Sequence, residues 1–497
     1  MQRNKPGFCR ASMCWAAILV AGWLAWLTPA LAVTFHVTST ADKVDINPGD
    51  GICDADPGSA SECTLRAAIM EANALPNVPG TPPGYDQIGI YSGTYTLGIA
   101  GRDEDAAASG DLDITETVGI FGQTPNRPVI DGAGLDRVFD FLADGILKDV
   151  IVQGGSATGS GIHGTGGGAR CFGGTVLYVL DTIVKNNSAS EMGGGLHAEN
   201  CQLVVGNSLV ERNNVTGGGG GISSRFAPLV VSASSILDNH AGPGSSGSSG
   251  GGGITTTAPD PADYTYIYQS TVAGNTADWG AGMTFGSRGY LIDSTITGNR
   301  GTYGGGAGLR TFNALDITAS TIYCNQSTST SYEAGVYLQG SSASVSIDNS
   351  ILARNTNANG EAECNGPLVS GGYNLIGDTT ACSVTGSTTG NQLNLDPLLA
   401  GPFPHPISAG TAGGRLAWLP RSMFGPTVDR GAPSGILYDN DADTSTPEVT
   451  LVKDQWNLTR PDDGDGDGTP RADVGAIESP VIMNDGFEID AGACPAP

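Results

Sequence analysis

The sequence predicts an all-β protein folded as a right-handed parallel β-helix, in which successive coils of strands share one hydrophobic interior. Three observations predict this fold class. One segment recurs seven times between about residues 176 and 355, apolar residues two positions apart recur within the copies, and glycine-rich runs follow most of them. The copies are 24 to 36 residues apart, a period that is typical of solenoids.

Each copy contains an apolar position, followed three residues later by asparagine. The alignment uses Ile183, Val210, Ile236, Val272, Ile296, Ile322 and Leu352, with Asn186, Asn213, Asn239, Asn275, Asn299, Asn325 and Asn355 as the asparagines. Serine stands two residues before the apolar position in six copies, and Asp181 stands there in the first. Apolar residues five and seven positions before it share one face of a strand. Because asparagine tolerates left-handed backbone and stacked amides bond to one another, we expect a buried asparagine ladder at a bend.

The glycine runs supply positive φ where each coil turns, and most end in an apolar residue that begins a further strand. His163 and His197 each follow such an apolar residue, so we expect them on neighbouring rungs about 5 Å apart. One interpretation is a metal-binding pair. The favoured one is an outward surface column, which Ser223, Thr255, Thr284, Arg310 and Tyr337 continue.

Residues 1–32 have the pattern of a secretory signal peptide. Three basic residues precede an apolar run from about Trp15 to Leu27, and the segment ends in small residues with cleavage expected after Ala32. A membrane anchor is the alternative, but the apolar run is short for a bilayer. We therefore expect a secreted or cell-surface protein with no integral membrane domain after signal removal.

The charge balance excludes nucleic acid and anionic membranes as partners. The whole chain carries a net charge of −27, and removal of the signal leaves 20 basic against 50 acidic residues. Binding to phosphate groups requires clustered lysine and arginine, which this chain lacks.

Eight cysteines remain after the signal, and an even number in an exported chain favours disulfides. Zinc is not expected, because no C-x-x-C motif is present. Proximity in sequence favours three pairs: Cys53 with Cys63, Cys171 with Cys201, and Cys364 with Cys382.

Residues 33–80 are expected to cap the first coil. Leu65, Ile69 and Ala72 have helical spacing, and Thr64 is placed to cap the helix N-terminus. The run CTLRAAIMEAN, together with Phe35 and DGIC at 50–53, resembles the CSLREA domain of exported bacterial β-helix proteins. Ala67 departs from that family, which usually has an acidic residue at this position.

The β-helix is expected over residues 81–390, a C-terminal region over 391–480 and a short tail over 481–497. LDPLL at 395–399 and ADVGAIE at 472–478 resemble the choice-of-anchor Q region of similar proteins, which implies closure of the far end of the solenoid. The repeats also resemble those of polymorphic outer-membrane adhesins, and parallel β-helices include pectate lyases and polygalacturonases.

The predicted function is binding or adhesion to a carbohydrate or cell-surface protein. Tyr264, Tyr266 and Tyr268 alternate around Thr265 and Ile267, so all three rings should point outward, where they could contact sugar faces. The alternatives are a lyase or hydrolase of acidic polysaccharide and a structural spacer. An enzyme is disfavoured because residues 176–355 hold only twelve scattered acidic residues and no Asp-Asp pair. The sequence leaves the oligomeric state open.

A calcium-type loop stands at residues 463–468. Asp463, Asp465 and Asp467 occupy the first, third and fifth positions, and Asp473 or Glu478 could replace the missing twelfth ligand at Val474. An acidic surface loop is the favoured interpretation, with structural Ca²⁺ as the alternative. No other cofactor is expected.

Overall fold

The computed structural model describes residues 32–58, 62–77, 84–102, 104–123, 125–243, 250–258, 263–404, 416–420, 425–438, 448–463, 469–478 and 494. The expected signal peptide therefore lies outside the described residues, apart from its last position. Across the described ranges, no helix is both long and apolar enough to span a bilayer.

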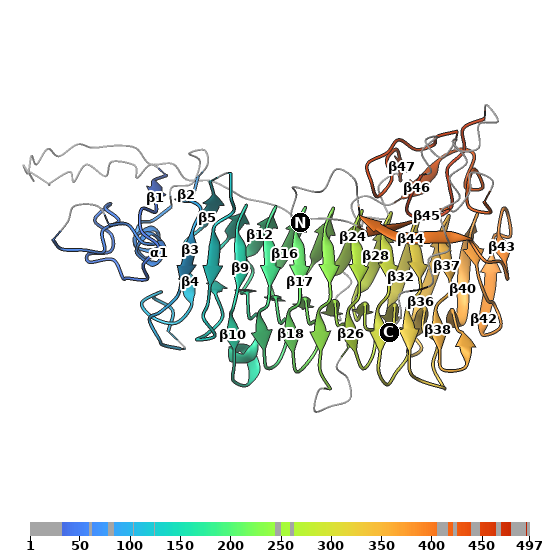
Figure 1. The fold of residues 1–497 in the computed structure, drawn as a ribbon, viewed down its shortest axis with the longest axis horizontal. Helices are drawn as coiled ribbons and strands as arrows, with labels where there is room; N and C mark the ends of the chain where they lie inside the picture. Colours follow the sequence, from blue (N-terminus) through green and yellow to red (C-terminus); the bar gives the residue numbers. More distant parts are fainter. Residues whose placement is uncertain are drawn as a thin grey trace, which may run out of the picture.

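The chain forms a parallel β-helix, as predicted (Figure 1). A complete coil holds four strands in the order face C, face A, face B and face D, for example β11 (Ala169–Phe172), β12 (Val176–Leu180), β13 (Ile183–Lys185) and β14 (Ser188–Ala189). Each strand pairs in parallel with its counterpart one coil later, as Leu177 does with Leu203 and Leu203 with Leu229.

The other strands follow the same arrangement. Face A contains β1 (Thr34–His36), β2 (Asp86–Ile90), β5 (Val118–Gly122), β8 (Gly145–Lys148), β16 (Gln202–Gly206), β20 (Leu229–Ser232), β24 (Tyr264–Tyr268), β28 (Arg288–Ile292), β32 (Ala314–Thr318), β36 (Ser344–Asp348), β40 (Cys364–Gly372) and β42 (Cys382–Gly386). Face C contains β4 (Leu112–Ile114), β7 (Phe139–Phe141), β15 (Leu196–Glu199), β19 (Ile222–Arg225), β23 (Ile254–Thr257), β27 (Met283–Phe285), β31 (Leu309–Thr311) and β35 (Val336–Leu338), and shares β40 with face A. Face B contains β3 (Thr94–Thr96), β6 (Val129–Asp131), β9 (Ile151–Gln153), β17 (Leu209–Glu211), β21 (Ser235–Leu237), β25 (Thr271–Ala273), β29 (Thr295–Thr297), β33 (Thr321–Tyr323), β37 (Ile351–Ala353), β41 (Leu375–Ile376) and β43 (Gln392–Leu393). Face D contains β10 (Ser156–Ala157), β18 (Asn214–Val215), β22 (His240–Ala241), β26 (Thr276–Ala277), β30 (Arg300–Gly301), β34 (Gln326–Ser327), β38 (Thr356–Asn357) and β39 (Gly360–Glu361).

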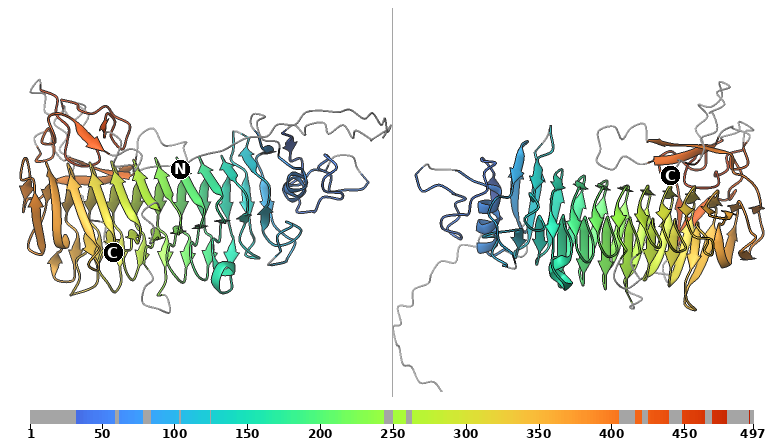
Figure 2. Two further views of the ribbon diagram at one scale, coloured as in Figure 1. Left: turned by 180° about the vertical axis from the view of Figure 1, so that it is seen from behind. Right: turned by 60° about the horizontal axis from the view of Figure 1, so that its bottom comes forward.

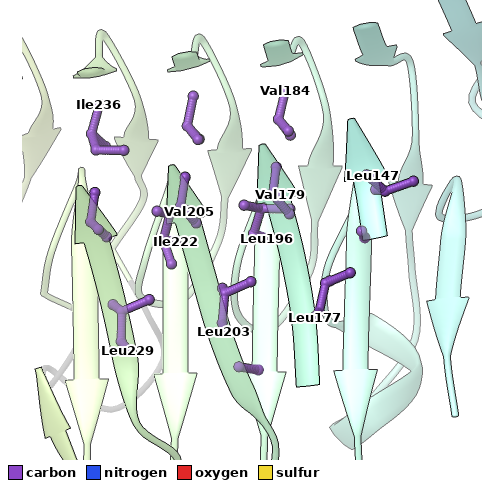
Figure 3. Packing of buried hydrophobic residues seen from close by; sticks show 14 of the residues in the cluster. Leu147, Leu177, Val179, Val184, Leu196, Leu203, Val205, Ile222, Leu229 and Ile236 are labelled. Carbon is purple, nitrogen blue, oxygen red and sulfur yellow. The ribbon is translucent and has the colours of Figure 1, made fainter. Parts of the chain in front are cut away.

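Aliphatic side chains from faces A, B and C fill the interior as ladders that run from coil to coil. Figure 3 shows Leu203 and Val205 of face A meeting Ile222 of face C and Ile236 of face B. All four side chains are fully buried. Burial of each such side chain contributes about 1.5–3 kcal/mol, so the repeated apolar positions are the main source of stability.

A ladder of asparagines lines the bend between faces B and D. Each side chain accepts a hydrogen bond from the backbone N–H of the previous asparagine and donates to the amide oxygen of the next. Asn213, for example, donates to Asn239 over 3.0 Å, and Asn239 donates to Asn275 over 3.0 Å. The series continues through Asn299 and Asn325 to Asn355. The ladder satisfies buried backbone and amide groups that water does not reach.

The predicted alignment of the first copy was wrong by one residue. Val184, not Ile183, pairs with Val210, and Asn187, not Asn186, bonds to Asn213. The residue before each ladder asparagine has positive φ, and Asn186, with φ of 54°, takes this bend position. The left-handed conformation that we expected of the ladder itself therefore belongs to the preceding residue. The same shift places Thr182, not Asp181, in line with the serines that stand two residues before the aligned apolar position. Its backbone N–H donates to the hydroxyl of Ser208.

A short helix covers the first coil, as the sequence predicts. Helix α1 (Leu65–Ala74) buries Leu65, Ile69 and Ala72, and its N-cap Thr64 accepts a hydrogen bond from the backbone N–H of Ala67. The helix packs against β2 and β4 at one end of the solenoid (Figure 2). It thereby protects the open edge and interior of the first coil.

The C-terminal region packs along the side of the solenoid, which differs from the expected closure of its end. It contains β44 (Leu399–Pro404), β45 (Leu416–Pro420), β46 (Ile436–Tyr438) and β47 (Val449–Leu451), which lie over the last third of the coils (Figures 1 and 2). Gln455 bonds to Ser270 and Thr295, several coils before the end. The buried Arg460 lies 3.3 Å from Asp293, so charged groups at the bend between faces A and B anchor this region.

Four disulfides are present. They join Cys53 to Cys63, Cys171 to Cys201, Cys364 to Cys382, and Cys324 to Cys494. Proximity in sequence indicated the first three pairs. The fourth links residues 170 positions apart and follows only from the fold.

Candidate functional site

The outward side of face A carries the three tyrosines that the sequence singled out. Thr265 and Ile267 of β24 are fully buried, so Tyr264, Tyr266 and Tyr268 point away from the interior and are half-buried. The register pairs Tyr266 with Tyr290 of the next coil. The alternation of side chains along a strand thus places the rings as expected.

The aromatic surface extends beyond this strand. The ring centres of Tyr266 and Tyr290 lie 6.1 Å apart, and those of Tyr266 and Tyr268 lie 6.3 Å apart. Tyr268 stacks on Tyr438 of the C-terminal region, with 5.9 Å between ring centres and 10° between ring planes. One of the three predicted rings is therefore partly covered, and the open surface begins beside it.

A groove of about 540 Å³ lies between face A and the C-terminal region. Its floor comes from β28, β32 and β36, and its opposite wall comes from residues 432–438 and Glu448. Three tyrosines line it: Tyr373 and Tyr438 are half-buried, whereas Tyr290 is only 3% exposed. The groove thus brings together aromatic residues from coils and from a segment that is about 150 residues away in the sequence.

Charged groups stand between the rings. Arg288 donates to Asp316 across two strands over 2.9 Å, and its guanidinium lies 5.0 Å from the centre of the Tyr290 ring. Ser346 of the next coil also donates to Asp316. The Nε atom of Arg288 is buried and has no hydrogen-bond partner within the described residues, so it remains available as a donor.

The acidic side of the groove contains Asp348 and Glu448. Burial raises the pKa of Asp348 to about 6, opposed by a hydrogen bond from the backbone N–H of Asn349 and reinforced by the nearby charge of Glu448. With Arg288 paired to Asp316, these two carboxyls leave the groove with a net negative charge at neutral pH.

Sequence reasoning missed most of this groove. Tyr290 was within reach, because it directly precedes Leu291, the residue aligned with Ile267, just as Tyr266 precedes Ile267. Arg288, Asp316 and Asp348 also stand at outward positions of predicted strands. Tyr438 could not be placed, since no repeat relates its segment to the coils.

The predicted histidine pair does not form. His163 lies in the short 3-10 helix η1 (Gly161–Gly164), and Arg170 occupies the rung beside His197. The register of the column is as expected, since His197 pairs with Ser223, and the series continues through Thr255, Thr284, Arg310 and Tyr337. The expected exposure was wrong, because His197, Ser223, Thr255, Thr284 and Arg310 are all buried. His197 is buried, and burial lowers its pKa, partly opposed by Glu199 at 3.5 Å.

The predicted calcium loop is only partly described. Asp465 and Asp467 lie outside the described residues. Asp473 is buried and accepts a hydrogen bond from the backbone N–H of Asp429 over 2.7 Å, while Glu478 accepts one from the backbone N–H of Asp462 over 2.9 Å. Both carboxylates thus hold the C-terminal region together, and structural Ca²⁺ at Asp463 stays a prediction.

No protein-family model matches the chain, and no curated protein matches it in sequence. Among solved structures, the chain is similar to the crystal structure of pectate lyase Pel9A. The identity is 12%, the TM-score is 0.42, and the alignment covers 91% of this chain and 98% of that one. A likeness at this level carries no argument about function, and the strand pairing by itself defines the parallel β-helix. The resemblances to the CSLREA domain and the choice-of-anchor Q region stay predictions.

Proposed function

We propose that this protein is a carbohydrate-binding module whose binding site is the groove between face A and the C-terminal region. The observation that carries the proposal is the meeting of the half-buried Tyr373 and Tyr438 around one open groove, which Arg288 and Asp316 also line. Aromatic rings contact the apolar faces of sugars, and charged side chains that are fixed in place bond to hydroxyl groups.

The charge of the groove favours a neutral carbohydrate. Among the described residues that line the groove, the one basic side chain is Arg288, which already pairs with Asp316, so Asp348 and Glu448 are not balanced there. The chain as a whole is also strongly acidic, with a net charge of −27. Like charges oppose association, so a polymer of uronic acids is a poor partner and a neutral glycan a good one.

The proposal is tested by retention of the mature chain on insoluble neutral and acidic polysaccharides. The double variant Tyr266→Ala/Tyr438→Ala removes half-buried rings beside and within the groove. Since each ring contact contributes about 1 kcal/mol, the two losses together should weaken binding to the retained polymer by about tenfold or more.

Tyr178→Ala provides the matched control. Tyr178 belongs to the same outward column as Tyr266, is 40% exposed, and lies on β12, several coils from the groove. Its loss should leave retention unchanged. Equal weakening by both variants, or unchanged retention of the double variant, would reject the groove as the binding site.

A hydrolase of polysaccharides is a second candidate, favoured by one observation. Burial raises the pKa of Asp348 to about 6, and Asp316 on the neighbouring strand pairs with Arg288. A carboxyl with a raised pKa near a second carboxyl is the residue pair that acid–base hydrolysis of a glycoside uses. Incubation with a panel of polysaccharides should then release reducing ends, and Asp348→Asn should abolish that release. Binding without product formation would leave the binding module as the function.

Export to the cell surface or medium completes the proposal. Four disulfides support it, because such bonds persist in oxidising compartments. A purely structural spacer would instead self-associate and retain no polysaccharide, an outcome that the same retention experiment detects.

A further inference from the structure

Three aspartates meet in the first coils of face C, far from the groove. Strands β4, β7 and β11 pair in register, which places Asp113, Asp140 and Arg170 on successive rungs of one outward column. Asp111 stands directly before β4. Carboxylate oxygens of Asp111, Asp113 and Asp140 all lie within 4.8 Å of one another.

These carboxylates are sealed from solvent, with exposed fractions of 3% for Asp111, 0% for Asp113 and 2% for Asp140. Two arginines neutralise part of their charge. Arg137 donates a hydrogen bond to Asp111 over 2.6 Å, and Arg170 donates to both carboxylate oxygens of Asp140. These ion pairs use only some of the lone pairs that each carboxylate offers.

Asp113 is the carboxylate without a cationic partner. Its Oδ2 atom accepts a hydrogen bond from the backbone N–H of Ala107 over 2.9 Å. Its Oδ1 atom is buried within the cluster and has no hydrogen-bond partner in the described part of the chain. A buried oxygen left in this way costs about 1–3 kcal/mol, so it indicates a missing binding partner.

The local charge is also unbalanced. Four buried carboxylates surround two guanidinium groups: Asp111, Asp113, Asp136 and Asp140 around Arg137 and Arg170. The deficit corresponds to one divalent cation.

A small cavity of about 220 Å³ adjoins the cluster. Asp111 and Asp140 line it, together with Glu104, Asp105 and the two arginines Arg137 and Arg170. The carboxylates therefore border a space large enough for a cation.

We infer that Asp111, Asp113 and Asp140 bind one Ca²⁺ ion, which fastens the N-terminal cap to the first coils. The donors are oxygens only, which favours a hard cation over zinc. Three protein carboxylates in a buried site favour Ca²⁺, which accepts many protein oxygens, over Mg²⁺, which usually keeps several waters. The cap is linked to this site because the buried Arg66 of α1 donates to the backbone oxygens of Ala107, Gly110 and Asp111.

The test uses the mature, disulfide-bonded chain after EDTA treatment. Thermal unfolding is followed while Ca²⁺ is added, and binding is measured by calorimetry. Wild-type protein should unfold at a higher temperature in Ca²⁺, with a smaller rise in Mg²⁺. Asp113→Asn should abolish the rise and weaken Ca²⁺ binding at least tenfold, while it folds normally in EDTA because the amide retains the shape of the protonated acid.

The triple variant Asp463→Asn/Asp465→Asn/Asp467→Asn separates this site from the C-terminal loop. It should keep the full Ca²⁺-dependent rise. The inference is overturned if Ca²⁺ leaves wild-type unfolding unchanged, if Asp113→Asn binds as wild type does, or if the rise disappears in the C-terminal triple variant.

Discussion

The groove on face A and the carboxylate cluster on face C occupy equivalent outward columns of the same solenoid but have opposite characters. The groove is open and aromatic, whereas the cluster is charged and sealed. The covering segments account for the difference. The C-terminal region leaves space beside Tyr438, whereas the loop that contains Ala107 and the turn around Ile162 close over the aspartates. In this fold the repeat supplies rigid columns, and the inserted segments decide what each column can bind.

The largest expected effect tests whether both regions depend on one scaffold. Asn239 lies in a coil between the cluster and the groove. Its side chain takes part in four buried hydrogen bonds, two donated and two accepted. Asn239→Ala leaves several buried groups without partners and should lower the free energy of unfolding by about 3–5 kcal/mol. Denaturant unfolding measures the change.

Asn186→Gly is the matched control for that variant. Asn186 is exposed at a bend with positive φ, and glycine takes the same position at Gly274 and Gly298 of later coils. Its effect should stay within about 0.5 kcal/mol. A large loss of stability in Asn186→Gly would contradict the corrected register of the first coil.

A second prediction concerns the pH dependence of stability, which should reflect the carboxylate cluster on face C rather than the groove on face A. The pKa of Asp113 is raised to about 8 in the folded chain, against about 4 when unfolded. Between about pH 4 and pH 8 the folded state therefore binds one more proton than the unfolded state. In EDTA, this group therefore contributes stability at low pH that is lost as pH rises from about 4 to 8. Urea unfolding should show wild type losing stability relative to Asp113→Asn over this range.

Burial is the main cause of the raised pKa of Asp113. The charges of Asp111, Asp140 and Glu104 raise this pKa further, and the hydrogen bond from the N–H of Ala107 lowers it. Saturating Ca²⁺ should remove or reverse the difference between wild type and Asp113→Asn, because the ion favours the charged carboxylate. Parallel pH profiles of the two proteins in EDTA would contradict the raised pKa.

The smallest expected effect concerns the wall of the groove. Tyr438→Ala removes the stack on Tyr268 and should cost about 1 kcal/mol. Hydrogen exchange should become faster in β46 and β47 but not in β12 or β16. Faster exchange throughout the coils would show that the C-terminal region is required for the solenoid itself.

The coils were predictable because burial repeats in the sequence with a fixed offset. The one-residue error arose where the sequence offers two equivalent choices, Ile183 or Val184 and Asn186 or Asn187. Burial decides between the first two, since Val184 is fully buried and Ile183 only partly.

The sites were harder to predict, for two reasons. The prediction about paired acids concerned only the regular copies. Two pairs of aspartates, Asp111 with Asp113 and Asp136 with Asp140, lie before these copies, in the opening coils. No repeat or spacing in the sequence predicts the contact of Tyr438 with Tyr268. Contacts between a solenoid and a non-repeating segment depend on tertiary packing alone.

Hydroxyl-radical footprinting with a retained neutral oligosaccharide would show directly whether the groove binds carbohydrate. The oligosaccharide should protect Tyr373 and Tyr438 of the groove from oxidation. Tyr178 and Tyr303, which are 40% and 69% exposed on other parts of the solenoid, should remain as reactive as in the free protein. Protection of Tyr178 or Tyr303, with the groove tyrosines unchanged, would contradict the account.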